Sequence, residues 1–309
     1  MTKEKYIIGV DIGGTNIRIG LISRENELRE YKIERTRNVI IKGQEMMRII
    51  DFVQQYQESL RAEYEIIAVS LGFPSIIDKS RKVILSTPNI SGLDDVKIVD
   101  KMGEILEIPV FIDTDVNMLM QYDIQNKQIP AKGVTVGFYL GTGIGNAISI
   151  NGEMLIGKSG VAGELGHIPI RGIHGECGCG NASCVEIIAS GKRLEEICET
   201  KLQGVPIKKV FEQCTDNPVI QKFIDDLSIP LATEINILDP DYIIIGGGVV
   251  QMPAFPKELL EESIRKYVRK PYPEQNLVFI YSEEEQENGV IGAGICGFKN
   301  INKCEEKEG

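Results

Sequence analysis

The chain has 309 residues and a mass of 34.3 kDa, which allows about two domains that each bury a core. Its formal charge of −11 and pI near 4.9 argue against nucleic acid or an acidic membrane surface as the main partner. No apolar run reaches the length of a membrane-spanning helix, and the N-terminus lacks the apolar centre of a secretion signal. We therefore expect a cytoplasmic globular protein.

The first motif is a glycine turn near the N-terminus. A short apolar run, the sequence DIGGTN at residues 11–16, and a second apolar run follow one another, which predicts strand, turn and strand. The N–H groups of Gly13 and Gly14, with the Thr15 hydroxyl, can bind phosphate oxygens, and Asp11 can hold Mg²⁺ through water. A plain β-hairpin turn is the simpler interpretation, because a glycine pair alone is weak support for a phosphate site.

Several elements are expected between residues 44 and 124. Apolar residues at helical spacing predict an amphipathic helix from Gln44 to about Glu63, and 66–71 is a buried strand. A short strand at 109–112 delivers Asp115 at its end, where ligands usually bind in α/β proteins. A helix then follows at 118–124, so an acidic or amide residue here can equally act as its N-cap.

The pattern of strand, Gly/Thr turn and strand returns about 130 residues after the first motif, beginning with Val134–Leu140. A third glycine cluster follows the apolar run Tyr242–Ile245 and precedes a segment that could open a helix. Two hairpin phosphate loops with a glycine-walled nucleotide pocket suggest a duplicated α/β fold that closes on ATP, although no P-loop motif occurs. The candidate residues of these two clusters are Gly141, Thr142, Gly143, Gly246, Gly247 and Gly248.

Residues 163–186 hold three of the seven cysteines and both histidines. Cys177, Cys179 and Cys184 form the pattern C-x-C-x4-C, and three thiolates with one imidazole make a closed tetrahedral zinc site. His167 and His174 are both possible fourth ligands by spacing. Whichever histidine binds zinc is not free to act as a general base, so the base must be sought among the carboxylates.

Other interpretations of this stretch are weaker. Disulfides are not expected, because no secretion signal is present and cysteines two residues apart pair poorly with each other. Inert buried cysteines rarely cluster beside two histidines. A zinc-dependent hydrolase would need an open coordination position, whereas four protein ligands close the shell.

Together these motifs resemble the ROK family of sugar kinases. The segments that carry the resemblance are DIGGTNIR, LGTGIG, GELGH, the cysteine pattern ending in Glu186, and INILDPDYIIIGGGV. The resemblance covers essentially the whole chain and implies the α/β fold of the actin-like (ribonuclease H-like) ATPases, duplicated into two lobes with a sugar between them. We expect a small lobe at 1–119, with a C-terminal helix at about 293–309 packing back on it. A large lobe at 120–292 would carry the zinc module at 163–186.

The resemblance also implies roles for individual residues. Asp115 would be the catalytic base, and His167 rather than His174 would complete the zinc site, which orders the loop that binds the sugar. ATP, Mg²⁺ and structural Zn²⁺ would be the cofactors, and a homodimer is common in the family. Family repressors carry a DNA-binding element before the first motif; because the first motif here starts at Asp11, we expect no such element. The residues expected to contact the sugar are Asn89, Thr114, Asp115, Glu164, His167 and Glu186; by its local sequence alone, Asn89 would be a turn residue.

The expected substrate is D-allose, phosphorylated at its 6-hydroxyl. The segments GFPSII, LSTPN, GVAGELGHIPI and GGGVVQMPAFP resemble the branch of the family that acts on this sugar. Thr114 stands where the family usually has Asn, Asp113 where it has Glu, and Ser75 where it has Gly, so the polar pattern expected near O3 of the sugar has changed. Glucose, fructose and N-acetylmannosamine are alternative substrates, and a sugar sensor without catalysis is an alternative function.

Overall fold

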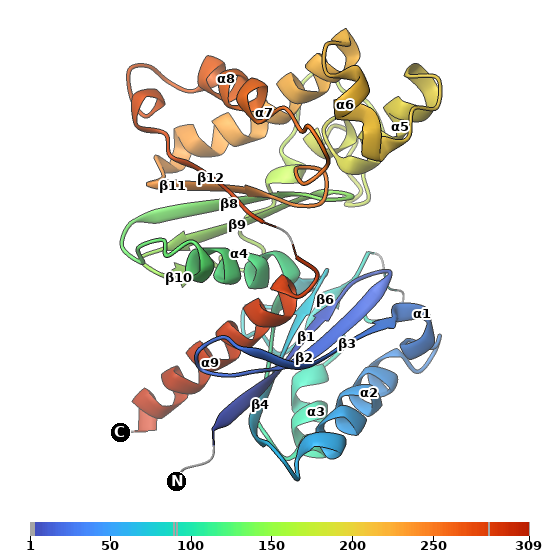
Figure 1. The fold of residues 1–309 in the computed structure, drawn as a ribbon, viewed down its shortest axis with the longest axis vertical. Coiled ribbons are helices and arrows are strands. Elements are labelled where there is room, and N and C mark those ends of the chain that lie inside the picture. Colours follow the sequence, from blue (N-terminus) through green and yellow to red (C-terminus); the bar gives the residue numbers. More distant parts are fainter. Residues whose placement is uncertain (1–3, 89, 91, 284, 309) are drawn as a thin grey trace. The chain divides into compact units, whose positions relative to one another are not determined.

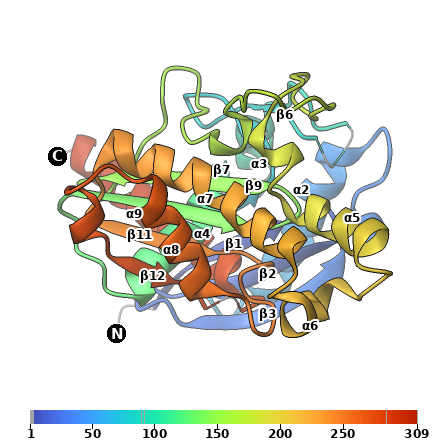
Figure 2. The same ribbon diagram turned by 90° about the horizontal axis from the view of Figure 1, so that it is seen from above.

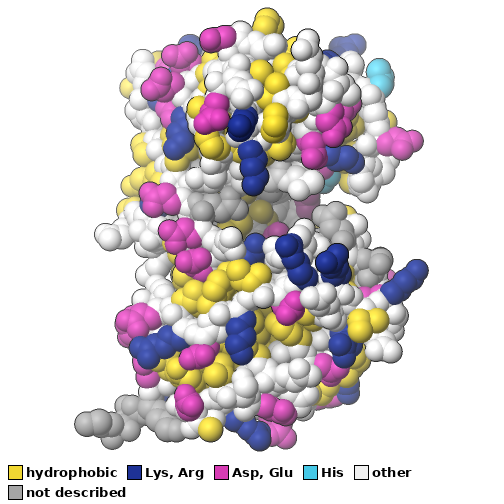
Figure 3. Space-filling model, turned by 45° about the vertical axis from the view of Figure 1, so that its right-hand side comes forward, with side chains coloured by type: hydrophobic (Ala, Val, Ile, Leu, Met, Phe, Trp, Pro, Cys, Tyr) yellow, Lys and Arg dark blue, Asp and Glu magenta, His cyan; other side chains and the backbone are white. Residues whose placement is uncertain are grey.

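The computed structural model describes residues 4–88, 90, 92–283 and 285–308. The chain divides into two compact units (Figure 1). Unit 1 comprises 1–128, 156–162 and 285–309, and unit 2 comprises 129–155 and 163–284. Among the described residues, no helix has the length and apolar character needed to cross a membrane. Acidic and basic side chains are interspersed on the face that Figure 3 shows.

Unit 1 is built on a five-stranded sheet in the order β3-β2-β1-β4-β7. Strands β1, β2 and β3 are antiparallel neighbours, whereas β4 and β7 continue the sheet in parallel with β1. The elements of this unit are β1 (Lys5–Ile12), β2 (Asn16–Ile22), β3 (Leu28–Arg35), α1 (Thr36–Val39), α2 (Glu45–Leu60), β4 (Glu65–Phe73), β5 (Ile76–Ile77), β6 (Ile84–Ser86), α3 (Ile98–Leu106), β7 (Val110–Thr114), α4 (Asp115–Asn126) and α9 (Asn288–Glu308).

Both faces of this sheet are covered, which explains why β1 is apolar at nearly every position. Ile8 packs into the core formed with α2 and α3, whereas the next residue towards the N-terminus, Ile7, packs against Phe298 of α9. Figure 1 shows α2 and α3 on one side of the sheet and α9 on the other. Helix α9 lies so close that a Cβ at Gly9 would be 2.3 Å from the carbonyl oxygen of Val290. Glycine at this position therefore permits the close approach of helix and sheet.

Unit 2 has a second five-stranded sheet, in the order β10-β9-β8-β11-β12. Helices α7 and α8 lie side by side against this sheet (Figure 2), and their apolar faces form one core with β8 and β11. The elements are β8 (Val134–Leu140), β9 (Ile144–Ile150), β10 (Glu153–Met154), the 3₁₀ turns η1 (Leu165–His167), η2 (Val185–Ile187), η3 (Ile207–Lys209) and η4 (Glu274–Asn276), α5 (Gly191–Lys201), α6 (Val210–Cys214), α7 (Pro218–Leu238), β11 (Tyr242–Gly246), α8 (Lys257–Tyr267) and β12 (Phe279–Tyr281).

The predicted strands and the amphipathic helix are present, with differences of a few residues at their ends. One local prediction is wrong: no helix opens directly after Gly248, because a series of turns follows and α8 begins only at Lys257. The C-terminal helix begins at Asn288, ahead of the expected start near 293.

The lobe boundaries also differ from the expected ones. The boundary at 119 falls inside α4, and all of α4 belongs to unit 1 because it packs along α9. Residues 156–162 and 285–292, which were expected in the large lobe, belong to unit 1 as well.

Candidate functional site

The first glycine turn joins β1 to β2 in unit 1. The N–H of Gly13 donates to the carbonyl oxygen of Asn16 at 2.9 Å, which closes the turn. The carbonyl oxygen of Thr15 accepts from the N–H of Thr36 at 3.0 Å, so the start of α1 holds the turn in place. Gly14 and Thr15 are exposed, and their backbone and hydroxyl groups can contact a phosphate.

Asp11 and Asp115 are neighbouring carboxyl groups in unit 1. Asp115 is the first residue of α4, and burial, followed by the charge of Asp11, raises the pKa of Asp115 to about 7. Burial also raises the pKa of Asp11, although Arg18 opposes this by donating from Nη1 to Asp11 Oδ2 at 2.9 Å. Two close carboxylates offer the oxygen ligands that Mg²⁺ prefers, so these residues fit that cation.

The helix N-cap predicted near Asp115 is its neighbour Thr114. The Thr114 hydroxyl oxygen accepts from the N–H of Asn117 at 3.3 Å, and Asp113 Oδ1 accepts from the N–H of Thr114 at 2.8 Å. The Asp115 carboxylate accepts from the N–H of the next residue, Val116, at 2.8 Å. Capping therefore falls to Thr114, while the Asp115 carboxylate remains available for proton transfer.

Two hydroxyl groups from separate loops meet in the same unit. Ser75 Oγ and Thr87 Oγ1 are 2.7 Å apart, and Asp94 holds the second loop by accepting from the N–H of Thr87 at 2.9 Å. Asn89, which the sequence nominates as a sugar contact, lies outside the described residues.

In unit 2 the other two glycine clusters come together. The Gly141–Gly143 turn joins β8 to β9, closed by the N–H of Gly141 donating to the carbonyl oxygen of Gly143 at 3.1 Å. Gly247 has φ +94°, and a Cβ there would lie 2.5 Å from the backbone of Leu140. A side chain is thus excluded at Gly247, and the turns at 141–143 and 246–248 lie against each other.

The structure brings His167, Cys177, Cys179 and Cys184 together in unit 2. Their ligand atoms all lie within 4.8 Å of one another. Cys179 Sγ is 3.5 Å from Cys184 Sγ, and Cys177 Sγ is 3.4 Å from His167 Nδ1. Tetrahedral zinc with Zn–S bonds of about 2.3 Å would separate its sulfur ligands by about 3.8 Å, so the cluster fits this ion. His174 is not part of the cluster.

The protonation of these thiols depends on their surroundings. Burial, followed by hydrogen bonds with Cys179 and Cys177, raises the pKa of Cys184 to about 12. A hydrogen bond from the backbone of Asn181 is the largest cause of the lowered pKa of Cys179. A cation that binds all three thiolates must therefore displace a proton from Cys184, which makes binding dependent on pH.

Two glutamates join this cluster to the rest of unit 2. His167 directs Nε2 to Glu164 Oε2 at 3.5 Å, so the imidazole lies between a carboxylate and the sulfur cluster. Burial, opposed by His167 and reinforced by Glu186, raises the pKa of Glu164. Glu186 Oε2 accepts from the N–H of Ile144 at 2.8 Å, which ties the module to the Gly141–Gly143 turn.

The predicted residues thus fall into two groups, each assembled within its own unit. Unit 1 brings together Asp11, the turn at 13–15, Thr114 and Asp115, and unit 2 brings together the other glycine turns and the zinc module. Arg18, the partner of Asp11, was not among the residues predicted from the sequence, although the hairpin register indicates it. Since the hairpin closes at Ile12 and Ile17, the residue opposite Asp11 must be Arg18.

The chain is similar to known proteins in sequence and in fold. A sequence model described as the ROK family matches residues 7–296. A glucokinase from Thermotoga maritima is 26% identical over 312 residues, which span 93% of this chain and 95% of that protein. The DNA-binding transcriptional dual regulator NagC of Escherichia coli is 24% identical, over 94% of this chain and 74% of that protein. The crystal structure of a ROK hexokinase from Thermus thermophilus superposes with a TM-score of 0.79 at 25% identity, over 96% of this chain and 99% of that chain.

Proposed function

The chain belongs to the ROK family, and we propose that it is an ATP-dependent kinase that phosphorylates a hexose at its 6-hydroxyl. The similarity to a glucokinase and to a ROK hexokinase supports this activity. The observation that carries it is Asp115 at the start of α4, with a pKa raised to about 7 beside Asp11.

Asp115 is the proposed general base. A base works best when its pKa lies near the working pH, and a value of about 7 meets this condition. Its carboxylate would accept the proton of the sugar 6-hydroxyl as the hydroxyl oxygen attacks the γ-phosphorus of ATP. Neither histidine is needed for this step, which agrees with the assignment of His167 to the metal cluster.

The remaining groups would position ATP and stabilise the negative charge of its phosphates. The turns at 13–15 and 141–143 and the glycines at 246–248 are proposed to bind the phosphates and nucleotide through backbone N–H groups. Mg²⁺, held through Asp11, would supply positive charge to the phosphate oxygens. Orientation is worth roughly 7–11 kcal/mol and a general base about 3–5 kcal/mol, so alignment of sugar and ATP should contribute more than proton transfer.

The cysteine cluster is proposed to hold structural zinc. By ordering the loop that carries Glu164 and Glu186, the metal would keep both carboxylates in place to accept hydrogen bonds from sugar hydroxyls. The contact between His167 Nε2 and Glu164 supports this, because the same imidazole faces the sulfurs through Nδ1.

D-allose is the proposed substrate within this class. Allose differs from glucose in an axial 3-hydroxyl. Thr114 directs its hydroxyl oxygen to the backbone of α4, and so presents less polar surface than the longer asparagine usual in the family. Ser75, paired with Thr87 at 2.7 Å, adds a hydroxyl that the usual glycine lacks. We expect a preference of roughly 1–3 kcal/mol for allose over glucose.

A coupled assay of ATP turnover on D-allose, glucose, fructose and N-acetylmannosamine tests both levels of the proposal. Turnover with allose at the highest kcat/KM, and a 6-phosphate product by NMR, would support it. Preference for another hexose would overturn the substrate and leave the kinase. Hexose binding without turnover would instead favour a sugar sensor without catalysis, a function for which the similarity to a transcriptional regulator speaks. The expected homodimer is checked by light scattering on the same sample.

A further inference from the structure

The turn between β5 and β6 projects an arginine into the interior of unit 1. Arg81 has φ +55°, a left-handed conformation that is uncommon for a residue with a side chain. Asp78 stabilises this turn, since its Oδ1 accepts from the N–H groups of Lys82 and Val83, each at 2.8 Å. Burial alone would raise the pKa of Asp78, but hydrogen bonds from Ser80, Val83 and Lys82 lower it to about 2. The turn is therefore built to hold Arg81 in one orientation.

The Arg81 guanidinium connects three segments of the chain. Nη1 donates to the carbonyl oxygens of Ile77 at 3.2 Å and Gly160 at 3.3 Å. Nη2 lies 3.2 Å from Asp113 Oδ1, and the two side chains are only 17% and 8% exposed. A planar guanidinium can serve several acceptors at once in this way, which an ammonium group does less well.

The first partner, Gly160, belongs to residues 156–162, which we call the crossover segment because the chain leaves unit 2 before it and returns after it. Gly160 is buried at φ +85°, and a Cβ there would lie 2.2 Å from the carbonyl oxygen of Ile77. The crossover segment is thus fitted closely to the Arg81 turn. It leads directly to Gly163 and Glu164.

The second partner, Asp113, supports the start of α4. Its Oδ1 accepts from the N–H of Thr114 at 2.8 Å and from Asn117 Nδ2 at 2.7 Å, in addition to facing Arg81. Asp115 lies two residues further along the chain. One guanidinium therefore restrains both the segment that leads to a proposed sugar ligand and the helix turn that carries the proposed base.

We propose that Arg81 is a positioning residue that sets hexose affinity through the crossover segment and base alignment through Asp113. The proposal rests on the proposed kinase function. Arg81→Gln should raise KM for the hexose and lower kcat, each by about tenfold, because small misplacements of reacting groups cost up to about a hundredfold. KM for ATP should change by less than about twofold, since the partners of the Arg81 guanidinium, namely Ile77, Gly160 and Asp113, do not belong to the glycine turns. Arg81→Lys should recover part of the loss by keeping the charge.

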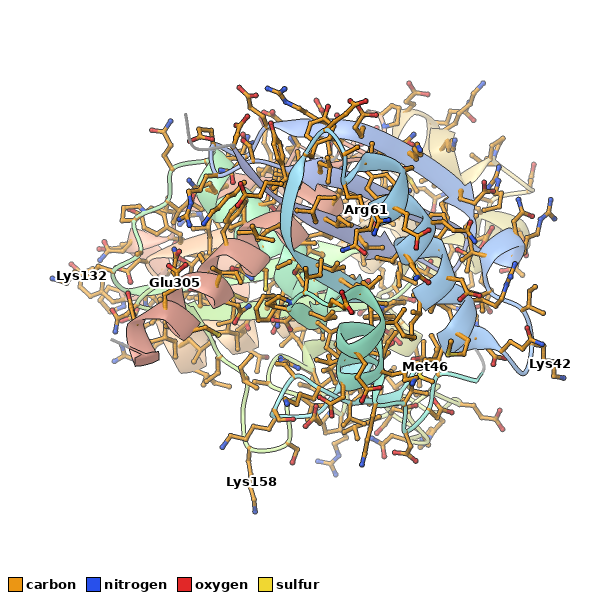
Figure 4. All side chains as sticks on the ribbon, turned by 90° about the horizontal axis from the view of Figure 1, so that it is seen from below. Lys42, Met46, Arg61, Lys132, Lys158 and Glu305 are labelled. Atoms are coloured by element: carbon orange, nitrogen blue, oxygen red, sulfur yellow. The ribbon has the colours of Figure 1, made fainter. Side chains whose placement is uncertain are left out.

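Two matched controls separate this role from a general loss of charge. Lys82→Gln removes a cation from the adjacent residue, whose exposed side chain pairs with Asp100 at 3.4 Å. Lys158→Gln alters the crossover segment itself, at a side chain that extends away from the protein (Figure 4). Both variants should keep wild-type kinetics, because Lys82 pairs with Asp100 at the surface and the Lys158 side chain is exposed.

The double variant Arg81→Gln/Asp113→Asn distinguishes positioning from stability. Arg81→Gln alone leaves Asp113 buried without its cation, so the midpoint of thermal unfolding should fall. Neutralising Asp113 should recover much of the loss in the midpoint of thermal unfolding. In contrast, kcat/KM for the hexose should stay low, because the crossover segment is still unrestrained. Recovery of kcat/KM together with the midpoint would overturn the proposal.

Hydrogen exchange provides a readout that does not depend on activity. Amides at 156–162 should exchange about tenfold faster in Arg81→Gln than in either control, with no change in α7. Exchange and kinetics equal to those of Lys82→Gln would overturn the inference. If the wild-type protein phosphorylates no hexose, the proposed kinase function fails. In that case the role of Arg81 is supported only if Arg81→Gln both speeds this exchange and weakens hexose binding by calorimetry. Any other result overturns the role of Arg81.

Discussion

The sheets of the two units correspond strand for strand, since β3-β2-β1-β4-β7 and β10-β9-β8-β11-β12 have the same order and the same parallel and antiparallel neighbours. Each begins with a hairpin closed by a glycine turn. The hairpins differ at the position one residue before the last pair, where β1 has Asp11 and β8 has Tyr139. Asp11 faces Arg18 across the hairpin, and Tyr139 faces Gly145.

The loops around the sheets differ further. In unit 1, β3 leads straight into α1, whereas its counterpart in unit 2, the two-residue strand β10, precedes the chain that forms the cysteine cluster. Asp115 stands at the start of α4, directly after β7. The shared frame supplies one glycine turn in the hairpin of each unit, and unit 2 has further glycines at 246–248. The carboxylates proposed for catalysis belong to unit 1 and the proposed metal module to unit 2, so two sheets of the same topology would carry different chemistry.

Loss of the proposed zinc from unit 2 should have the largest effect among the tests of this difference between the two units. Cys179→Ser should lower zinc from one per chain to none by elemental analysis and abolish hexose affinity, while ATP still binds. Structural zinc sites contribute about 10–16 kcal/mol of apparent binding free energy, comparable with the stability of a whole domain of about 5–15 kcal/mol. Cys304→Ser, at an exposed position on α9, is the control. A zinc-free Cys179→Ser protein with normal hexose KM would contradict the proposed role of unit 2.

The next effect concerns the carboxylate of unit 1. Asp115→Asn should lower kcat by about 10²–10⁴-fold, or about 3–5 kcal/mol, and leave hexose binding by calorimetry largely unchanged. Because the base must be deprotonated, wild-type kcat/KM should rise with pH and level off above the pKa of about 7. Asp100→Asn, in an exposed pair with Lys82, is the control. Near-normal turnover by Asp115→Asn would remove this residue from the mechanism.

A smaller effect is expected from the buried carboxyl group of unit 2. Glu234 on α7 accepts from Asn146 Nδ2 at 3.0 Å, and burial raises the pKa of Glu234 from 4.5 to about 7. Since the folded pKa is raised, the stabilising contribution of this group is complete below 4.5 and is lost as pH rises through about 7. The free energy of unfolding in urea should therefore be measured for both proteins at pH 5.5 and pH 8.5. Between these pH values, the difference between Glu234→Gln and wild type should shift by about 2 kcal/mol in favour of the variant. Parallel pH dependences of the two proteins would contradict this.

The smallest effect concerns sugar choice in unit 1. Thr114→Asn should narrow the allose-to-glucose ratio of kcat/KM by about tenfold, or about 1.4 kcal/mol, because asparagine adds polar groups that suit an equatorial hydroxyl. Asparagine is as good an N-cap as threonine, so thermal stability should be unchanged. Thr114→Ser, which keeps the hydroxyl and the cap, should retain the wild-type ratio. An unchanged ratio in Thr114→Asn would separate this residue from substrate choice.

Much of the frame could be predicted because it depends on local patterns. The apolar runs of β1, β4, β8 and β11 alternate with glycine turns, and each is recognisable within about ten residues. The family prediction is confirmed by the match over residues 7–296. The helix start expected after Gly248 is wrong: turns follow instead, and Val249 and Val250 within them are buried in the core of unit 2.

The sequence by itself determined the strand–turn–strand motifs, the cysteine spacing and the acidic residue at the start of α4, since these depend on neighbours along the chain. Spacing alone left both His167 and His174 possible, and the family resemblance favoured His167; the tertiary structure places His167 beside the sulfurs. It also decided that Thr114 caps α4 and that Arg81 joins Asp113 to Gly160. These contacts join segments separated by up to 79 residues, and such pairings are set by the packing of the whole unit rather than by local propensity.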